Sequence, residues 1–299
     1  MKKIYVIGST VVDMIINVDH LPTTKADIHI SSQMASMGGC AYNVSDTVRN
    51  FGTPSVLFSP VGSGIYGDFV RNGLRKKGLI SPIPPVEMAN GCCYCFVEEN
   101  GERTFVSYHG AEYLIQAEWL EEIDVEEVHS IYICGLEIEE KTGENIVKWM
   151  EKHPQIPAFF APGPRIMKID ASLLERIYKL HPVMHLNDDE IKEYFATDDV
   201  NQAMVDMYAK TGNTVIVTLG EKGATWYDGT EVKLAPPVKV DTVVDTIGAG
   251  DSHIGAVMAG LYNGKTMEQA ILDANKVAAA VVGVKGALLT QEEFDAVMA

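Results

Sequence analysis

The chain has 299 residues, of which 46% are hydrophobic and 22% charged, so it can bury a large core, and wholesale disorder is excluded. Its 41 Asp and Glu residues against 24 Lys and Arg give a formal net charge of -17, which argues against nucleic acid or an anionic membrane as a partner. A phosphorylated ligand would have to be held by local amides, a few basic groups or a metal ion rather than by the general surface.

The cysteines and the first residues of the sequence favour a reducing compartment. Polar side chains soon interrupt the apolar run Ile4–Ile7, unlike the hydrophobic region of a signal peptide, and no later stretch is long and apolar enough to span a bilayer. The five cysteines are odd in number and mostly lie among apolar residues. The Cys92–Cys95 group lacks the second cysteine pair of a zinc site, so we interpret it as ordinary strand residues. We therefore expect a cytoplasmic protein.

Short β-branched runs alternate with longer segments of helical period, which is the pattern of a parallel sheet covered by helices. The predicted strands are Ile4–Ile7, Ser55–Phe58, Ser130–Ile133, Ala158–Phe160, Val183–Leu186 and Thr214–Leu219. The predicted helices are Ala41–Asn50, Tyr66–Lys77, Thr142–Glu151, Ser172–Leu180, Asp188–Phe195, Val200–Lys210, Ser252–Tyr262 and Thr266–Val282. These elements predict an α/β fold.

Two regions break this alternation. At about residues 12–37 and 90–110, strand-like pieces follow one another without intervening helices, for example Cys92–Val97 and Thr104–Tyr108. We expect these two regions to pair as a small separate sheet. A further hairpin over residues 224–234 is expected to add antiparallel edge strands to the main sheet.

The segment from Val238 to Ala256 is the most informative about chemistry, because it runs from a strand through a glycine-rich turn into a helix. The turn Gly248–Gly250 lies where the first helical amides are unpaired and point outward. Its two glycines remove the side chains that would keep an anion away from the backbone. The sequence therefore predicts a phosphate-binding turn.

Asp251 directly follows this turn. A carboxylate at a helix N-terminus stays ionised and would repel a phosphate unless it serves another purpose. As a general base, it would accept the proton of a hydroxyl that attacks a phosphoryl group held by the amides. The alternative is that Asp251 only caps the helix, because Asp is a preferred cap and glycine-rich turns are common. The spacing alone leaves both interpretations open.

The segment Asp245–Asp251 resembles the C-terminal signature of the ribokinase-like (PfkB) family of sugar and nucleoside kinases. The N-terminal signature is matched by Gly38 and Gly39, followed by Asn43 and a helix that ends near Phe51, and the order of elements agrees over nearly the whole chain. The resemblance implies one domain over residues 1–299, a three-layer, Rossmann-like helix–sheet–helix core with a small β-sheet lid. The lid would be formed by about residues 12–37 and 90–110.

The resemblance also implies an activity: ATP-dependent transfer of the γ-phosphoryl group to a hydroxyl. Asp251 would be the base, and the amides of Gly248, Ala249 and Gly250 would form an anion hole.

On the acceptor side, the resemblance implies that Asp13 binds acceptor hydroxyls and that Gly38, Gly39 and Asn43 belong to the acceptor-binding signature. A carboxylate and an amide suit a polyol, because each forms directed hydrogen bonds with neighbouring hydroxyls. Without the family, Asp13 would be interpreted as a solvent-facing strand residue and Asn43 as a first-turn helix residue with a local hydrogen bond. The two glycines would then be a plain turn.

The resemblance also implies cation binding at two places in the sequence. Asn187 and Glu190 match an Asn-x-x-Glu that in the family helps to organise Mg²⁺ and the phosphates, often through water. The same spacing is a capping box, and both roles are compatible. Asp245 falls in a loop that binds a monovalent cation, such as K⁺, in many relatives.

The nucleotide-edge loop of the family is matched by Thr218–Gly223, in which Gly220 and Gly223 let the backbone pass close to a ligand. Asn275, on the last long predicted helix, corresponds to a position near the adenine. We therefore expect Thr218, Gly220, Gly223 and Asn275 to bind the nucleotide.

Four residues depart from the family pattern. Gly64 stands at an aspartate position, Cys40 where some sugar kinases carry Lys, and Ala161 where a turn usually begins with Asp. His253 stands two residues after the predicted base, where an aromatic residue is usual. Because the phosphoryl-transfer signature is intact, we expect these departures to concern the acceptor and its surroundings.

A different enzyme class is suggested by Gly62–Gly67, which satisfies the G-x-G-x-x-G fingerprint of an NAD-dependent oxidoreductase. The fingerprint does not follow the first strand, and Glu87, at about the distance of a ribose-binding carboxylate, lies in a Pro-rich stretch. A non-catalytic sugar-binding regulator is a further alternative. The retention of Asp251 and of the complete glycine turn argues against it.

The sequence thus predicts an Mg²⁺- and ATP-dependent kinase that phosphorylates a hydroxymethyl group of a small uncharged sugar, with a nucleoside as the main alternative acceptor. Sugar phosphates rank lower because the acceptor motifs contain no Lys or Arg pair for a second phosphate, although Arg103 or Arg165 could reach the site from elsewhere in the fold. The family resemblance further suggests a homodimer that forms through the lid.

Overall fold

The main sheet has eight strands in the order β12-β11-β10-β9-β8-β7-β1-β4, in a computed structural model that describes residues 1–299. The strands are β1 (Lys3–Ile7), β4 (Ser55–Phe58), β7 (Val128–Cys134), β8 (Ala158–Ala161), β9 (Val183–Asn187), β10 (Val215–Thr218), β11 (Ala224–Tyr227) and β12 (Val232–Ala235). Strands β4 to β10 in this order run parallel, and β11 and β12 add antiparallel pairs at one edge. The predicted parallel sheet with an antiparallel edge is therefore confirmed.

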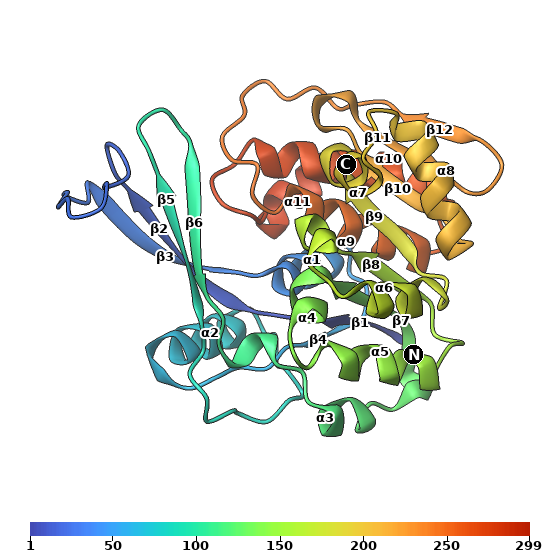
Figure 1. The fold of residues 1–299 in the computed structure, drawn as a ribbon, viewed down its shortest axis with the longest axis horizontal. Coiled ribbons are helices and arrows are strands. Elements are labelled where there is room, and N and C mark those ends of the chain that lie inside the picture. The colour runs from blue at the N-terminus through green and yellow to red at the C-terminus, as the bar shows by residue number, and fades with distance from the viewer.

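Helices cover both faces of this sheet (Figure 1). They are α1 (Cys40–Asn50), α2 (Gly64–Lys76), α3 (Ala117–Glu121), α4 (Gly135–Glu139), α5 (Gly143–Lys152), α6 (Ala171–Tyr178), α7 (Asp188–Phe195), α8 (Val200–Thr211), α9 (Ala249–Tyr262), α10 (Met267–Val282) and α11 (Gln291–Met298). Side chains alternate between the two faces of a strand, so Ile4 and Val6 pack in one core with α1, α9 and α10. Tyr5 and Ile7 pack in the other core with α5, α6 and α8. The fold is a three-layer α/β structure, as predicted.

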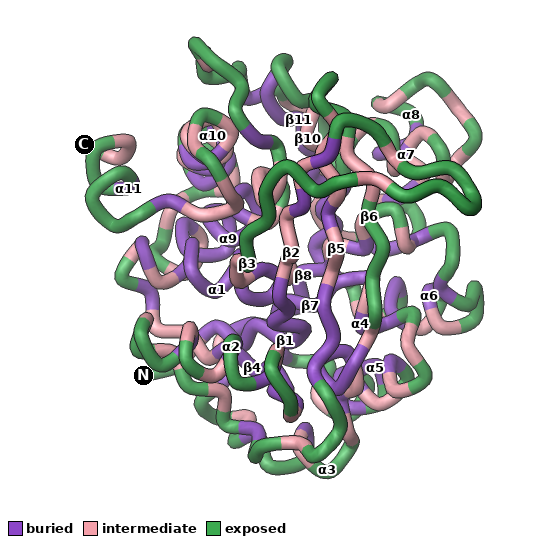
Figure 2. Tube along the Cα trace, turned by 90° about the vertical axis from the view of Figure 1, so that its left-hand side faces the viewer, coloured by how far each residue is buried: buried purple, intermediate pink, exposed green.

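A second sheet of four strands stands beside the main sheet, on the left in Figure 1. It consists of β2 (Val11–Asn17), β3 (Ser32–Gly38), β5 (Cys92–Val97) and β6 (Arg103–Tyr108), in the order β3-β2-β5-β6. We call it the small sheet. Figure 2 shows that most of β3 and β6 is exposed, whereas parts of β2 and β5 are buried. The predicted small separate sheet, made from two distant parts of the chain, is confirmed.

Several predicted element boundaries have clear local causes. Asn187 and Glu190 form a complete capping box at the start of α7, and Thr266 and Gln269 form another at the start of α10. Several predicted boundaries differ from the structure by one or two residues, and the largest difference among the predicted helices is at α9, which begins at Ala249 rather than at Ser252. Its N-cap is Gly248, whose φ of 77° is the left-handed conformation that glycine adopts without strain. Gly250 and Asp251 therefore lie within the first turn of the helix.

The structure also bears on the Cys92–Cys95 group and on membrane-spanning segments. Cys92, Cys93 and Cys95 are free cysteines of β5, and no group of three or more His, Cys, Asp or Glu residues is arranged to hold a metal ion. None of the helices combines the length and the apolar character that crossing a membrane would require.

Candidate active site

The N-terminus of α9 presents backbone N–H groups that the chain itself does not use. The amides of Gly248, Gly250 and Asp251 donate to no acceptor in the protein, and that of Ala249 makes only a long bond of 3.4 Å to the Thr246 carbonyl. A Cβ added to Gly250 would meet no atom within 4 Å, so the space beside this residue is open. Free amides at a helix N-terminus with open space beside them form a suitable site for an anion.

The side chain of Asp251 turns toward α1 rather than toward its own helix. Its Oδ2 accepts a hydrogen bond of 2.9 Å from Asn43 Nδ2, and no side chain caps α9. This geometry contradicts the interpretation of Asp251 as a helix cap. Asn43 is 3% exposed, and its Oδ1 has no hydrogen-bond partner. A buried acceptor without a partner next to the Asp251 carboxylate is suited to a hydroxyl of a ligand.

Gly38 and Gly39 join the small sheet to α1 and leave room for the polar groups around them. A Cβ on Gly38 would lie 1.8 Å from Asp13 Oδ2, so the Asp13 carboxylate packs directly against this glycine. Gly39 has a φ of 102°, and a Cβ there would lie 2.6 Å from the Ser9 carbonyl oxygen. The two glycines are thus required by close approach and by backbone conformation, and they bring Asp13 of β2 close to the start of α1.

The two carboxylates of this region influence each other. Burial raises the pKa of Asp251 to about 6, although hydrogen bonds from Asn43 and from the Cys40 thiol act in the opposite direction. Burial also raises the pKa of Asp13 to about 6, and the negative charge of Asp251 contributes to this rise. Asp13, Asn43 and Asp251, which are predicted on separate parts of the sequence, therefore form one site. A carboxylate with a raised pKa is a stronger proton acceptor than an ordinary one and is still ionised at neutral pH.

Asn187 and Glu190 lie at the carboxyl end of β9 and at the start of α7. Asn187 Nδ2 donates to Glu190 Oε1 at 2.9 Å, and the Asn187 backbone N–H donates to Oε2 at 3.0 Å. Burial raises the pKa of Glu190, and the nearby Asp189 charge adds to this effect. Both Glu190 oxygens already accept a hydrogen bond, so this carboxylate is suited to a hydrated Mg²⁺ held through water and lacks the protein ligands for an all-protein cage.

The predicted nucleotide-binding residues lie near the antiparallel edge of the main sheet. Thr218 ends β10, and Gly220 and Gly223, with φ of 57° and 92°, flank the short turn that follows. A Cβ on Gly223 would lie 2.3 Å from the Ala235 carbonyl oxygen. Asn275 Nδ2 donates to that same oxygen at 3.3 Å and to the Pro236 carbonyl at 3.0 Å. The structure thus brings Gly223 and Asn275 together around the end of β12.

His253 and Asn275 belong to a buried chain of hydrogen bonds. Asn275 uses its amide protons on the two backbone carbonyls, so its Oδ1 accepts from His253 Nε2 at 3.2 Å. His253 Nδ1 is then the acceptor for His185 Nε2 at 2.9 Å. Burial lowers the pKa of His253 to about 4 and that of His185 well below its ordinary value, so both rings are neutral. His253 is packed and hydrogen-bonded inside the core instead of facing a ligand.

Asp245 is bonded by a residue of the small sheet. Arg103 Nη1 donates to Asp245 Oδ1 at 2.5 Å, and the same oxygen accepts the Ile247 backbone N–H at 2.9 Å. Arg165, the other cation considered for an acceptor phosphate, bonds Glu139 Oε2 at 3.1 Å. Each guanidinium is thus paired with a carboxylate of the protein itself.

Local geometry explains some of the other departures from the family pattern. Gly64 is the first residue of α2 and has a φ of 78°, where an aspartate would be strained. Cys40 is the first residue of α1, and its thiol lies near Cys134 and near the Asp251 carboxylate, whose pKa it acts to lower. Ala161 ends β8 and carries no polar group. Nothing in the structure explains the loss of a carboxylate at this position.

Two buried glutamates of this region are not among the predicted site residues. Glu137, on α4, accepts the Ser9 backbone N–H at 2.8 Å, and its Oε2 has no partner. Glu112 accepts from the Gly91 N–H at 2.7 Å and from the Gly110 N–H at 3.1 Å, where the chain enters and leaves the β5–β6 hairpin. Neither residue belongs to a recognisable motif. Glu137 follows the predicted strand Ser130–Ile133 and Glu112 follows the predicted strand piece Thr104–Tyr108, and neither pattern indicates a buried carboxylate.

The glycines of the G-x-G-x-x-G sequence have packing roles. A Cβ on Gly62 would lie 2.5 Å from both the Asn90 nitrogen and the Met88 carbonyl oxygen. A Cβ on Gly67 would lie 1.9 Å from the Gly62 carbonyl oxygen. These contacts account for both positions without a dinucleotide.

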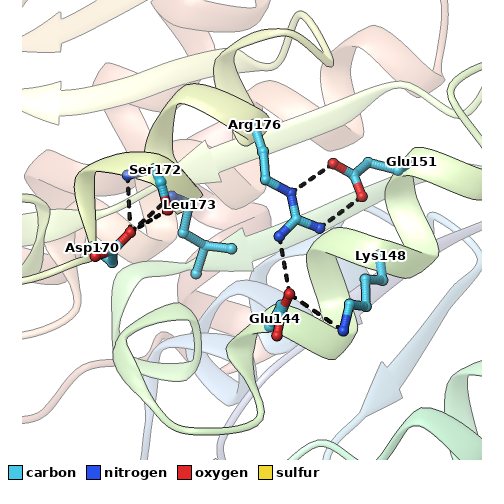
Figure 3. Close-up of polar contacts among 7 residues, drawn as sticks. All are labelled: Glu144, Lys148, Glu151, Asp170, Ser172, Leu173 and Arg176. Atoms are coloured by element: carbon cyan, nitrogen blue, oxygen red, sulfur yellow. Dashed lines mark hydrogen bonds and ion pairs between the residues drawn. The ribbon is translucent and has the colours of Figure 1, made fainter.

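A cavity of about 350 Å³ lies on the opposite face of the main sheet, between α3 and α5, and its charged groups are already paired. Figure 3 shows Arg176 between Glu144 and Glu151, with Lys148 also on Glu144. In the same view, Asp170 caps the start of α6. This surface offers no unpaired group comparable to those around Asp251, and we do not treat it as the active site.

Comparison with known proteins supports a single family. The family model described as pfkB family carbohydrate kinase matches residues 1–293. The sequence is 36% identical over 289 residues to the uncharacterized sugar kinase YegV of Escherichia coli (strain K12). The aligned region covers 95% of this chain and 90% of the relative. It is 26% identical over 307 residues to the ribokinase of Bacillus subtilis (strain 168), with 99% of each chain covered.

The same family is found among solved structures. The crystal structure of ribokinase from Thermotoga maritima superposes with a TM-score of 0.83 at 25% sequence identity, covering 100% of this chain and 99% of the other. The family match decides against the NAD-dependent oxidoreductase. The chain belongs to the pfkB family of carbohydrate kinases, and it is a ribokinase-like sugar kinase, a phosphotransferase that acts on a sugar hydroxyl group.

Proposed function

We propose that this kinase transfers the γ-phosphoryl group of ATP to a hydroxymethyl group of a small uncharged sugar, with Asp251 as the general base. The observation that carries the proposal is the position of the Asp251 carboxylate. It lies beside free amides at the start of α9, accepts a hydrogen bond from Asn43, and is close enough to Asp13 to influence its pKa. Anion-binding groups and acceptor-binding groups thus meet at one proton acceptor.

The proposed reaction uses these groups in turn. Asp13 and the free Oδ1 of Asn43 hold hydroxyls of the sugar and orient one of them toward the phosphoryl group. Asp251 accepts the proton of that hydroxyl as the new O–P bond forms. The free amides of Gly248 and Gly250, with Ala249 between them, stabilise the negative charge on the phosphoryl oxygens.

We propose ATP with Mg²⁺ as the phosphoryl donor. One fold neighbour, the ribokinase of Arabidopsis thaliana, was solved in complex with ribose and ATP; it is 17% identical, with a TM-score of 0.82. Thr218, Gly220 and Gly223 would border the nucleotide, while Asn275 would act through the backbone carbonyls that it holds. Asn187 and Glu190 would hold Mg²⁺ through water, and the ion would supply charge neutralisation between the phosphates.

A neutral acceptor is supported by the charges of the site. Asp13 and Asp251 are both acidic, and the two guanidinium groups considered for an anionic acceptor, Arg103 and Arg165, are paired with Asp245 and Glu139. A carboxylate or phosphate on the acceptor would meet repulsion without compensation. A nucleoside is also neutral and stays the alternative, because the nucleoside kinase of Methanocaldococcus jannaschii is 25% identical over 309 residues.

We further propose that the small sheet is the lid of one kinase domain over residues 1–299, in which case the acceptor is enclosed between Asp13 and α9. The exposed side chains of β6, Phe105, Val106 and Tyr108, favour a second copy of this chain as a partner across the lid. The net charge of -17 supports a small-molecule substrate rather than nucleic acid. The cytoplasm is the proposed location.

The decisive experiment is an ADP-release screen with Mg²⁺ and ATP across pentoses, hexoses, keto-deoxy acids and nucleosides. We expect release with at least one neutral sugar and none with anionic acceptors. Release with nucleosides alone would replace the sugar by the nucleoside alternative. Binding of a sugar, seen as thermal stabilisation, without ADP release from any acceptor would instead identify a regulator.

A further inference from the structure

The bond between Arg103 and Asp245 joins two separate parts of the molecule. Arg103 begins β6, the edge strand of the small sheet, and Asp245 lies 142 residues later in the loop before α9. The two side chains are 25% and 7% exposed. No other ion pair connects a strand of the small sheet to the main α/β core. In Figure 1 this loop, in orange, extends toward the β5–β6 hairpin.

Asp245 shapes the turn that leads into the anion-binding amides. Its Oδ1 accepts the Ile247 N–H at 2.9 Å, which closes the turn directly before Gly248. The backbone N–H groups of Val244 and Asp245 donate to the Val282 carbonyl at 2.9 and 3.2 Å, so the loop is anchored on the end of α10. Arg103 therefore bonds the side chain that determines how the following amides are presented.

The pair remains charged at neutral pH. Burial acts to raise the pKa of Asp245, but the hydrogen bonds from Arg103 and from the Ile247 N–H outweigh it and lower that pKa below its ordinary value. An ion pair between two elements that can move relative to each other favours the arrangement in which both partners meet. Arg103 also brings a positive charge to the loop at which the family resemblance implies a monovalent cation.

We propose that Arg103 is a positioning residue for phosphoryl transfer. Its bond to Asp245 fastens the small sheet over the acceptor and at the same time fixes the turn that presents the Gly248 and Gly250 amides. Arg103 touches neither substrate. It acts by coupling closure on the acceptor side to the geometry of the phosphate side. This inference rests on the proposed function, because it assigns a role within the same reaction.

The kinetic test is a double-mutant cycle of Arg103→Gln and Asp245→Asn, in which the introduced amide oxygen can still accept the Ile247 N–H. With ATP and acceptor saturating, we expect each single variant to lower kcat by roughly tenfold, and the double variant to be no slower than the slower single variant. Arg103→Lys keeps the charge and should restore part of the rate. Arg75→Gln is the matched control, because Arg75 is an exposed residue of α2 that bonds only Asn72.

Two kinetic outcomes would overturn the proposal: additive losses in the double variant, or equal rates for Arg103→Gln and Arg75→Gln. A KCl titration adds a second readout. If Arg103 supplies the charge at Asp245, K⁺ should stimulate Arg103→Gln more than the unmodified enzyme. Equal stimulation of both proteins would show that the guanidinium does not occupy a cation position.

A ligand-free measurement separates this proposal from the proposed function. Hydrogen exchange of Arg103→Gln should be faster than that of the unmodified protein both in β6 and in residues 245–251, although only one of these segments carries the substitution. If the unmodified enzyme releases no ADP with any acceptor, the proposed function fails and the exchange data still decide the coupling. Unchanged exchange in residues 245–251 would refute the coupling even if the kinase activity is confirmed.

Discussion

The carboxylate of Asp251 is subject to opposing effects that together suit a general base. Removal from water raises its pKa, whereas the Asn43 amide and the Cys40 thiol stabilise its charged form and limit the rise to about 6. The group is thus ionised at neutral pH and still basic enough to take a proton from an alcohol as phosphoryl transfer proceeds. The same residue type fully exposed at a helix N-terminus would be a weaker base, because the helix dipole and water both stabilise the anion.

We predict that Asp251→Asn lowers kcat by a factor of about 10² to 10⁴ while ATP and the acceptor still bind, because the amide keeps the shape and loses the proton acceptor. The measurements are kcat and the two KM values, with binding checked by thermal stabilisation. The unmodified enzyme should lose activity as the pH falls through about 6, where Asp251 becomes protonated. A variant that loses binding and turnover in equal proportion would indicate a structural role instead.

At the scale of elements, the sequence predicts most elements that a local pattern determines, although α11 was not among the predicted helices despite its capping box. Asp188–Phe195 and Ser55–Phe58 have the predicted bounds, because a capping box begins the one and a short β-branched run forms the other. The helices α3 and α4 were missed because five residues are too few to develop a helical period. The start of α9 was misplaced because Gly248, not a polar residue, is its N-cap.

Contacts between distant elements could not be predicted in this way. His185 was assigned to a buried strand, but nothing in its neighbourhood indicates a partner 68 residues later on α9. The hydrogen-bonded chain from His185 through His253 to Asn275 links β9, α9 and α10, and so holds the helix that carries Asp251 against the strand that ends at Asn187. The family signatures indicated which residues meet at the site, but not what keeps their helices in place.

Because the rings of His185 and His253 are both neutral in the folded protein, its stability depends on pH. Both histidines have a folded pKa below their unfolded value, so the unfolded chain binds protons first as the pH falls. Their contribution is fully present above about 6.5, the unfolded pKa of His, and is lost as the pH falls toward the folded pKa of about 4 for His253. Acidification in this range should therefore destabilise the protein.

We predict that His253→Phe lowers the free energy of unfolding at pH 7.5 by about 1–3 kcal/mol, because His185 and Asn275 lose their partner in the core. The deficit should narrow toward pH 5, since the variant no longer has to keep this ring neutral. Thermal unfolding between pH 4.5 and 7.5 measures both effects, with His29→Phe at an exposed position as the matched control. If the variant's deficit in the free energy of unfolding stays constant over this range, the His253 ring is not kept neutral by the fold.

At the scale of the whole molecule, the small sheet packs on the main core at its base through Val12 and Cys92, and polar contacts add to this packing. The Glu112 carboxylate holds the two ends of the β5–β6 hairpin through the Gly91 and Gly110 amides, and a Cβ on Gly110 would lie 2.3 Å from the Gly91 nitrogen. On the α2 side, Tyr66 and Tyr94 share one hydrogen bond of 3.1 Å between their hydroxyls. A sheet fastened by a narrow base, with exposed edge strands, can open without unfolding the core.

We predict that hydrogen exchange is faster in the small sheet than in the central strands of the main sheet. Amides of β5 and β6 should exchange faster than those of β1 and β7, because they are protected only against local opening, whereas the central strands exchange through global unfolding. Addition of ATP, Mg²⁺ and an acceptor should slow exchange in β2 and β5, since β2 carries Asp13 and pairs with β5 in parallel. Helix α8, on the opposite face of the main sheet from α9, is the internal control and should not respond. If the small sheet is as well protected as β1 and β7 without ligands, it is a fixed part of the core, and access to Asp251 would need another route.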